Sequence, residues 1–242
     1  MPLPLEAFTI YGGCNCRAVR YAIDVPPEAS RPVHPWSNST VTFPFIVICH
    51  CNDCRAASAG LTLTAICNAL TQVRFSLLPR DAPPIQSGEE RTFVPAAQVV
   101  FPAEPPANTL LATYHSSPSV TRTFCARCGT NLTYARHPLP EGWPPIVDVL
   151  LGSVDKEDLE RYGLRPDRHV FWDCGVGWIQ DLFAGDGGLP RHPRADLRIF
   201  TSAQRYGFKI DRETGTRLNQ NLRQIVASKS LAMFKLFIAF KL

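Results

Sequence analysis

Short runs of alternating or continuous hydrophobic residues recur along most of this chain, which favours strands over long helices. Val19, Tyr21 and Ile23 alternate with Arg20 and Ala22, which is the period of two expected for a strand. Residues 43–49 form a continuous apolar run typical of a buried strand. Further strands are predicted over 61–69, 72–77, 110–116, 121–124, 131–135, 146–151 and 168–172, with a partly stranded stretch over 92–101. Short helices are predicted over 55–59 and 155–162.

Two proline-rich segments, 24–42 and 79–108, interrupt this pattern and are predicted to be surface loops inserted into the domain. The chain has 242 residues, 22 of them proline, and only 19% are charged, which favours a loop-rich, mainly β domain. A hydrophobic content of 45% is enough for a core without help from a metal. We expect one domain over 8–200 and a separate tail over 203–242.

The charge of the chain is concentrated in that tail. Residues 203–242 carry eight Lys and Arg against two Asp and Glu, a net charge of +6, while the rest of the chain carries −2. The body therefore lacks the basic surface of a nucleic-acid-binding protein, and no nucleic-acid partner is predicted. We expect a loosely attached tail, with contact to an anionic membrane as the alternative. The sequence contains no run of 18 apolar residues, so no transmembrane helix is predicted.

Three thiols, Cys49, Cys51 and Cys54, fall within six residues in the order C-x-C-x-x-C. A stretch this short can bring three sulfurs onto one metal ion, but it supplies no fourth. Zinc prefers four tetrahedral ligands, and a zinc with three protein ligands keeps a position for water or substrate. This spacing therefore predicts an open, catalytic zinc site, and the missing fourth thiol favours zinc over an iron–sulfur cluster.

Two distant pairs, Cys14/Cys16 and Cys125/Cys128, supply four more thiols, enough for a closed structural zinc. Each pair is predicted to lie in a turn between strands, helped by a neighbouring glycine. Two alternatives stay open: Cys14 and Cys16 could pair with two of the central cysteines, or the thiols could be buried small hydrophobes. Cys67 and Cys174 lie outside these groups, and no chemical role is predicted for either.

The number of cysteines, nine, is odd, and the N-terminus has neither a basic region nor a long apolar run. Both observations argue against a secreted, disulfide-bonded protein. Reduced thiols fit the cytoplasm best, with the nucleus as the alternative compartment.

Several motifs occur here in a characteristic order over about residues 8–180. They are Gly13-Cys14-x-Cys16 followed by Val-Arg-Tyr, Cys49-x-Cys51-x-x-Cys54-Arg55, Tyr114-His-Ser-Ser117, Phe124-Cys-x-x-Cys-Gly-Thr130, Leu151-Gly-Ser-Val-Asp155 and His169-Val-Phe. In these motifs the chain resembles the family of glutathione-dependent formaldehyde-activating enzymes and centromere protein V.

The resemblance implies a β-tent of small antiparallel sheets. It assigns Cys14, Cys16, Cys125 and Cys128 to a structural zinc, and Cys49, Cys51 and Cys54 to a catalytic zinc. It also implies a carbon–sulfur lyase activity that joins glutathione to formaldehyde and reverses the reaction, so the expected partners are a small thiol and a small aldehyde.

Glutathione carries two carboxylates, so Arg55 is predicted to contact the co-substrate. The alternative function is a non-enzymatic binding module stabilised by two zinc ions, in which a histidine such as His50 or another residue closes the central site.

Overall fold

The structure is a computed structural model, and it describes residues 3–35, 37, 41–83, 91–100, 108–139 and 143–194. The chain divides into two units, Met1–Arg198 and Ile199–Leu242. The predicted tail at 203–242 lies outside the described residues, as do parts of both proline-rich segments.

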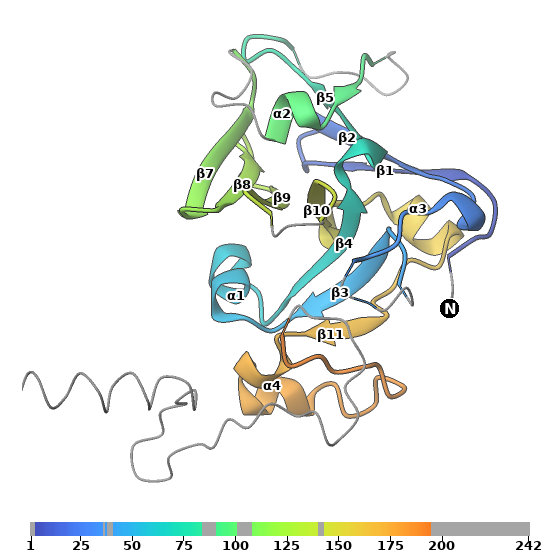
Figure 1. Cartoon of the computed structure of the whole chain (residues 1–242). Coiled ribbons are helices and arrows are strands. Elements are labelled where there is room, and N and C mark those ends of the chain that lie inside the picture. The colour runs from blue at the N-terminus through green and yellow to red at the C-terminus, as the bar shows by residue number, and fades with distance from the viewer. Residues whose placement is uncertain are drawn as a thin grey trace, which may run out of the picture. The chain divides into compact units, whose positions relative to one another are not determined.

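The described residues form a mainly β protein with eleven strands in two sheets, which confirms the predicted fold class (Figure 1). The four-stranded sheet has the order β1 (Phe8–Gly13), β2 (Val19–Val25), β5 (Val73–Leu77) and β6 (Val94–Pro95). The seven-stranded sheet has the order β11 (Arg168–Val170), β3 (Phe45–Cys49), β4 (Leu63–Ala69), β10 (Ile146–Leu150), β9 (Asn131–Arg136), β8 (Val120–Cys125) and β7 (Leu111–Ser117). All neighbouring strands are antiparallel except β11 and β3, which are parallel.

The helices of the described residues are short. They are α1 (Asn52–Ser58), α2 (Ala97–Val100), α3 (Lys156–Arg161) and α4 (Gly177–Asp181), with 3-10 turns η1 (Glu28–Ser30), η2 (Leu70–Gln72), η3 (Leu151–Ser153) and η4 (Trp172–Cys174). Helix α1 begins three residues earlier than predicted, because the Cys51 sulfur caps its first turn. The stretch predicted as partly stranded over 92–101 forms the two-residue strand β6 and then α2, and α4 was not predicted. Among the described residues, no helix is both long enough and apolar enough to cross a membrane.

Both faces of the seven-stranded sheet contribute buried residues, and each face contributes to a different hydrophobic cluster. One face contributes Ile66 and Val147 to a large core shared with Tyr21 and Phe75 of the four-stranded sheet. The other face contributes residues such as Cys67 to a smaller cluster that also contains residues of the α1 region. All five residues of β3 are buried, which explains its continuous apolar sequence.

The described part of the first proline-rich segment, 24–42, is exposed over residues 27–30 and at Val33, but it also contains buried side chains. His34 and Val41 are only 2% and 7% exposed. The His34 ring packs against Phe43 and Phe45, with centroids 5.6 Å and 5.4 Å away. The side chains of His34 and Val41 are buried because they pack against Phe43 and Phe45, whose apolar rings would otherwise face water.

Candidate metal centres

A four-thiol site joins the two sheets. Cys14 and Cys16 lie in the turn between β1 and β2, while Cys125 ends β8 and Cys128 lies in the turn after it. Their four sulfurs lie within 4.8 Å of one another. The predicted pairing of these cysteines is therefore the one that the fold brings together, and the alternative in which Cys14 and Cys16 join the central cysteines is wrong.

The sulfurs of the four-thiol site are spaced as a tetrahedral zinc requires. The Sγ atom of Cys16 lies 3.6 Å from that of Cys14 and 3.6 Å from that of Cys125. Four sulfurs about 2.3 Å from a central zinc would be about 3.8 Å apart. The donor set and its spacing therefore fit Zn²⁺.

Backbone and hydroxyl groups hold both turns of this site. The Val19 amide donates to Cys14 Sγ at 3.2 Å, and the Thr130 hydroxyl lies 3.2 Å from Cys128 Sγ. The Asn15 amide donates to the same Thr130 hydroxyl, which ties the two turns together. Gly129 has a φ of +73°, a left-handed conformation that glycine adopts without strain.

The thiols of this site differ in acidity in the absence of a metal. Burial raises the pKa of Cys14 to about 12. Burial also raises the pKa of Cys128, but hydrogen bonds from Thr130 outweigh it and bring that pKa to about 6. A cation would favour the thiolate at every position, because metal ligation requires the deprotonated sulfur.

A three-thiol site lies where β3 passes into α1. Cys49 ends β3, Cys51 caps α1 and Cys54 lies in its first turn. The three sulfurs lie within 4.8 Å of one another, and those of Cys49 and Cys51 are 3.5 Å apart. The Cys54 amide donates to the Cys51 sulfur at 3.3 Å, as expected for a helix cap. Three sulfurs at this spacing fit three corners of a zinc tetrahedron.

The three thiols share protons when no metal is present. Hydrogen bonds from Cys49 and Cys54 lower the pKa of Cys51 to about 2. The same contact with Cys51 raises the pKa of Cys49. One sulfur therefore serves as the acceptor for the other two, and a cation would replace those protons.

Arg122 of β8 contacts this site, although the sequence did not single it out. Its side chain is buried, with 4% of the residue exposed. Nη2 donates to Cys54 Sγ at 3.4 Å, Nε donates to Ser116 Oγ at 3.1 Å, and the guanidinium lies 5.0 Å from the centre of the Tyr134 ring. No sequence spacing connects residues 54 and 122, so only the sheet order could reveal this contact.

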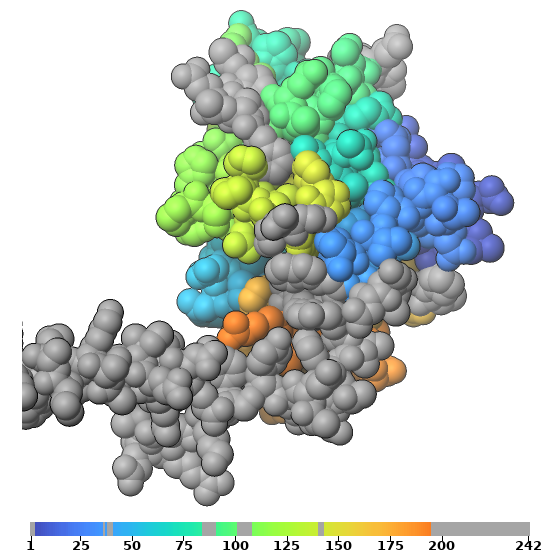
Figure 2. All heavy atoms as spheres, viewed as in Figure 1, coloured from blue at the N-terminus to red at the C-terminus, as the bar shows by residue number. Residues whose placement is uncertain are grey.

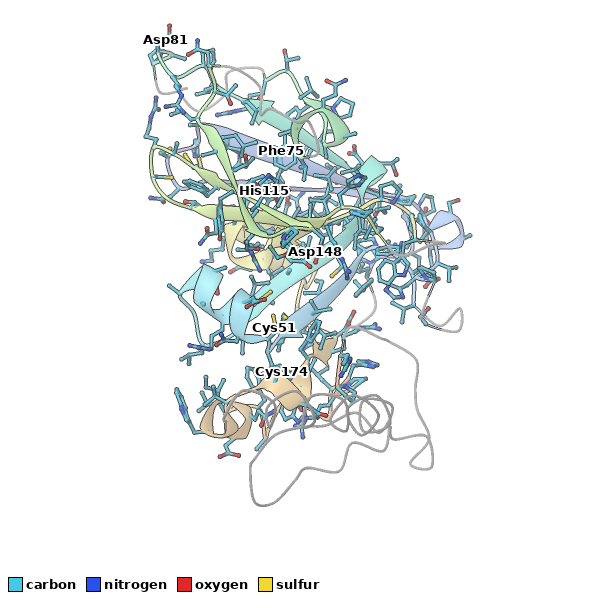
Figure 3. The ribbon with its side chains drawn as sticks, turned by 60° about the vertical axis from the view of Figure 1, so that its left-hand side comes forward. Cys51, Phe75, Asp81, His115, Asp148 and Cys174 are labelled. Carbon is cyan, nitrogen blue, oxygen red and sulfur yellow. The ribbon has the colours of Figure 1, made fainter. Side chains whose placement is uncertain are left out.

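A row of polar groups crosses the same face of the sheet. Cys67, Asp148, Tyr134 and Arg122 oppose one another on β4, β10, β9 and β8, and directly opposed residues share a face. Asp148 is part-buried as a residue, but its Oδ1 is shielded from solvent and has no hydrogen-bond partner among the described residues. Burial raises the pKa of Asp148 to about 7, opposed by the neighbouring Cys67 thiol and the Arg122 charge. Figure 3 shows Asp148 between Cys51 and Phe75 in that view.

His50, between two of the thiols, belongs to a buried hydrogen-bonded chain. His50 Nε2 lies 2.8 Å from His169 Nδ1, and His169 Nε2 lies 2.9 Å from an oxygen of Asp186. Burial lowers the pKa of both histidines, that of His50 to about 4. If His169 Nε2 carries the proton given to the carboxylate, then its Nδ1 accepts from His50 Nε2–H. His50 Nδ1 then carries no proton, and it is buried without a hydrogen-bond partner in the part of the chain that the structure describes.

A small pocket opens beside the three-thiol site, between α1 and strands β7 to β9. Its polar lining comes from Ser58, Tyr114, Arg122, Asn131 and Thr133. Figure 2 shows the surface of α1, in light blue, next to that of the β7–β8 hairpin, in green. Because Arg122 lines the pocket and also contacts Cys54, the pocket and the thiols are neighbours.

Other residues considered from the sequence lie apart from the thiols or outside their ligand sets. Arg55 lies on α1 but donates to Asn52 Oδ1 at 2.7 Å, so its predicted contact with a co-substrate remains a prediction. Cys67 is buried, and Cys174 is exposed on η4. Among the described residues, neither thiol site includes a histidine or carboxylate.

No family model matches the sequence, and no curated protein matches it either. The family resemblance, the carbon–sulfur lyase activity and the compartment therefore remain predictions. The structure itself shows two groups of cysteines, and each group is arranged so that it could bind a zinc ion.

Proposed function

We propose that this protein is a zinc-dependent carbon–sulfur lyase that forms and breaks adducts between a thiol such as glutathione and a small aldehyde. The observation that carries the proposal is the unequal division of the thiols into a set of four and a set of three. The set of three leaves one position of a zinc tetrahedron for substrate, and it adjoins a pocket.

The reaction conserves all atoms and transfers no electrons to a cofactor. The thiol sulfur forms a bond to the carbonyl carbon, the C=O double bond becomes a single bond, and the thiol proton ends on that oxygen. The reverse reaction breaks the C–S bond and returns the proton to sulfur. When bound, zinc would supply a positive charge that lowers the pKa of a thiol and stabilises a developing alkoxide.

Residues of this chain would bind the zinc ion and orient its ligands. Cys49, Cys51 and Cys54 would be the zinc ligands, and the cap of α1 fixes the turn that carries them. The hydrogen bonds from His50 through His169 to Asp186 connect the same turn to β11 and to the loop that follows α4. Such outer contacts are expected to orient the ligands, as they do in other zinc sites.

The alternative is a non-enzymatic binding module in which a histidine or another residue closes the central zinc, and the two thiol sites are compatible with it. His50 is the histidine nearest in sequence to the ligands, but its Nε2 is engaged by His169. Among the described residues, no histidine nitrogen lies within the three-thiol cluster.

The test is a survey of activity with protein that carries two zinc ions per chain. Glutathione would be mixed with formaldehyde and a panel of small aldehydes, and adduct formation would be followed by NMR exchange spectroscopy. We expect exchange faster than the uncatalysed reaction for at least one aldehyde, and no such increase for Cys51→Ser. A fully zinc-loaded protein without activity across the panel would instead identify a binding module.

A further inference from the structure

Arg122 is a buried cation for which the described part of the chain offers no carboxylate in a salt bridge. The residue is 4% exposed, and among the described residues no salt bridge involves it. Burying an unpaired charge is strongly unfavourable, so a compensating negative charge is expected nearby. Asp148, in the same row, does not supply it fully, because burial holds its pKa near neutrality.

When zinc is bound, the three thiols would supply negative charge beside Arg122. Its Nη2 atom donates to Cys54 Sγ at 3.4 Å. Ser116 and the Tyr134 ring hold the other parts of the guanidinium, so three separate strands or helices fix its position. This is a built contact between a guanidinium and a sulfur that would be a thiolate when zinc is bound.

A simple sum of charges shows what this contact achieves. Three thiolates around a divalent cation carry a formal charge of −1, and an additional thiolate would raise this to −2. Adding the +1 of Arg122 makes the resting site neutral, so an incoming anion meets no net repulsion. Burial of Arg122 makes this difference larger than it would be at the surface, because screening by water is reduced.

Arg122 also faces the side from which a ligand could arrive. It lines the pocket between α1 and β7 to β9, together with Ser58 and Tyr114. Among the described residues, no hydrogen bond uses its Nη1 atom. One edge of the guanidinium therefore contacts a thiol of the site, and another edge is available to a molecule in the pocket.

We propose that Arg122 compensates the charge of the three-thiol site, so that it can accept a fourth, anionic thiolate from a small-molecule thiol. This inference rests on the proposed function and identifies the residue that lets an anionic sulfur bind there. Arg122 acts through the thiols as a positioning residue. The proposal also gives a reason for burying its guanidinium, which is costly for stability.

The test measures thiol binding rather than turnover. Zinc would be replaced by Co²⁺ at both sites, and 2-mercaptoethanol would be titrated at fixed pH while the sulfur-to-cobalt absorption is recorded. The four-thiol site is saturated with protein sulfurs, so a change on adding thiol reports the three-thiol site. We expect Arg122→Gln to weaken thiol binding at least tenfold, and the matched control Arg136→Gln, an exposed arginine on the adjacent strand β9, to behave as the wild type.

Arg122→Lys separates charge from shape, and it serves as the test if Arg122→Gln does not fold. Lysine keeps the charge but not the planar fork. We expect it to retain most of the thiol affinity, whereas a lysine variant as weak as the glutamine variant would overturn the proposal. Wild-type binding by Arg122→Gln would also overturn it and leave the proposed function intact. A wild-type protein with two cobalt ions that shows no response to thiol would count against the proposed function itself.

Discussion

The two faces of the seven-stranded sheet carry two thiol sites of different character. The four-thiol site belongs to the larger core, where its sulfurs pack among aliphatic and aromatic side chains from both sheets. The three-thiol site belongs to the smaller cluster, beside the buried polar row of Arg122, Tyr134 and Asp148 and the chain from His50 to Asp186. Hydrophobic surroundings suit a structural metal, while buried polar groups are costly and therefore point to a second purpose.

The number of thiols is only part of the difference between the sites. The four-thiol site joins two turns that are more than a hundred residues apart in sequence, so a metal there would close a long loop. The three-thiol site lies within six residues and closes almost no loop. Losing metal from the first should therefore damage the fold, whereas losing it from the second should damage chemistry.

The largest expected effect is that of Cys125→Ser on the fold. A structural zinc contributes about 10–16 kcal/mol of apparent binding free energy, which is comparable to the whole stability of a domain. We expect the variant to lose its cooperative thermal transition, as measured by circular dichroism, and to retain less than one zinc. A variant that melts like the wild type would show that the core on this face is sufficient without the metal.

The next effect is that of Cys51→Ser on metal content and activity. The wild type should bind two zinc ions per chain under reducing conditions, and the variant one. We expect its thermal transition to remain and its lyase activity to be lost. If this variant unfolds while Cys125→Ser does not, then the roles given to the two sites are reversed.

A smaller effect concerns Asp148 and pH. Its pKa is about 7 in the folded protein and about 3.9 in an unfolded chain, so the folded state holds the proton more tightly. Stability attributable to this group is therefore greatest below about pH 4 and falls until about pH 7. Asp148→Asn has no ionisable group at this position, so it does not lose this stability as the pH rises. We expect the free energy of unfolding of the variant, minus that of the wild type, to increase by about 2 kcal/mol from pH 5.5 to pH 7.5.

The measurement for Asp148 is chemical denaturation of both proteins, with zinc present at each pH. The matched control is Asp181→Asn, an exposed carboxylate on α4, which should follow the wild type at all values. A constant difference between Asp148→Asn and the wild type across this range would mean that Asp148 is already ionised in the folded protein.

The smallest effect is that of His169→Gln on metal retention. His169 is completely buried and connects His50 to Asp186, so its loss should loosen the turn that carries Cys49 and Cys51. We expect a chelator to remove one zinc about tenfold faster, in line with other outer contacts of metal sites. The second zinc should leave at the wild-type rate, and His115→Gln, on an exposed strand position, should change neither. Equal acceleration for both ions would indicate general destabilisation.

The sequence alone was sufficient for the features that depend on nearby residues. Alternation with a period of two predicted β2, and a continuous apolar run predicted the fully buried β3. The cysteine spacing predicted the three-thiol site and each pair of the four-thiol site, because a knuckle is a local turn whose ligands lie a few residues apart. Which pairs meet in the four-thiol site was left open by the sequence, and the fold decided it. The helix that follows Cys51 was predicted too short, since a sulfur is an unusual helix cap.

Only the tertiary structure decided the surroundings of these sites. Arg122 reaches Cys54, 68 residues away, and His50 reaches His169, 119 residues away, through the order of strands in one sheet. Neither contact leaves a periodic signal, because hydrophobic patterning reports which face a residue occupies and not what lies opposite. The sequence thus determined which thiols could bind a metal, and the sheet decided which charges and hydrogen bonds surround them, since those depend on strand neighbours that no local pattern encodes.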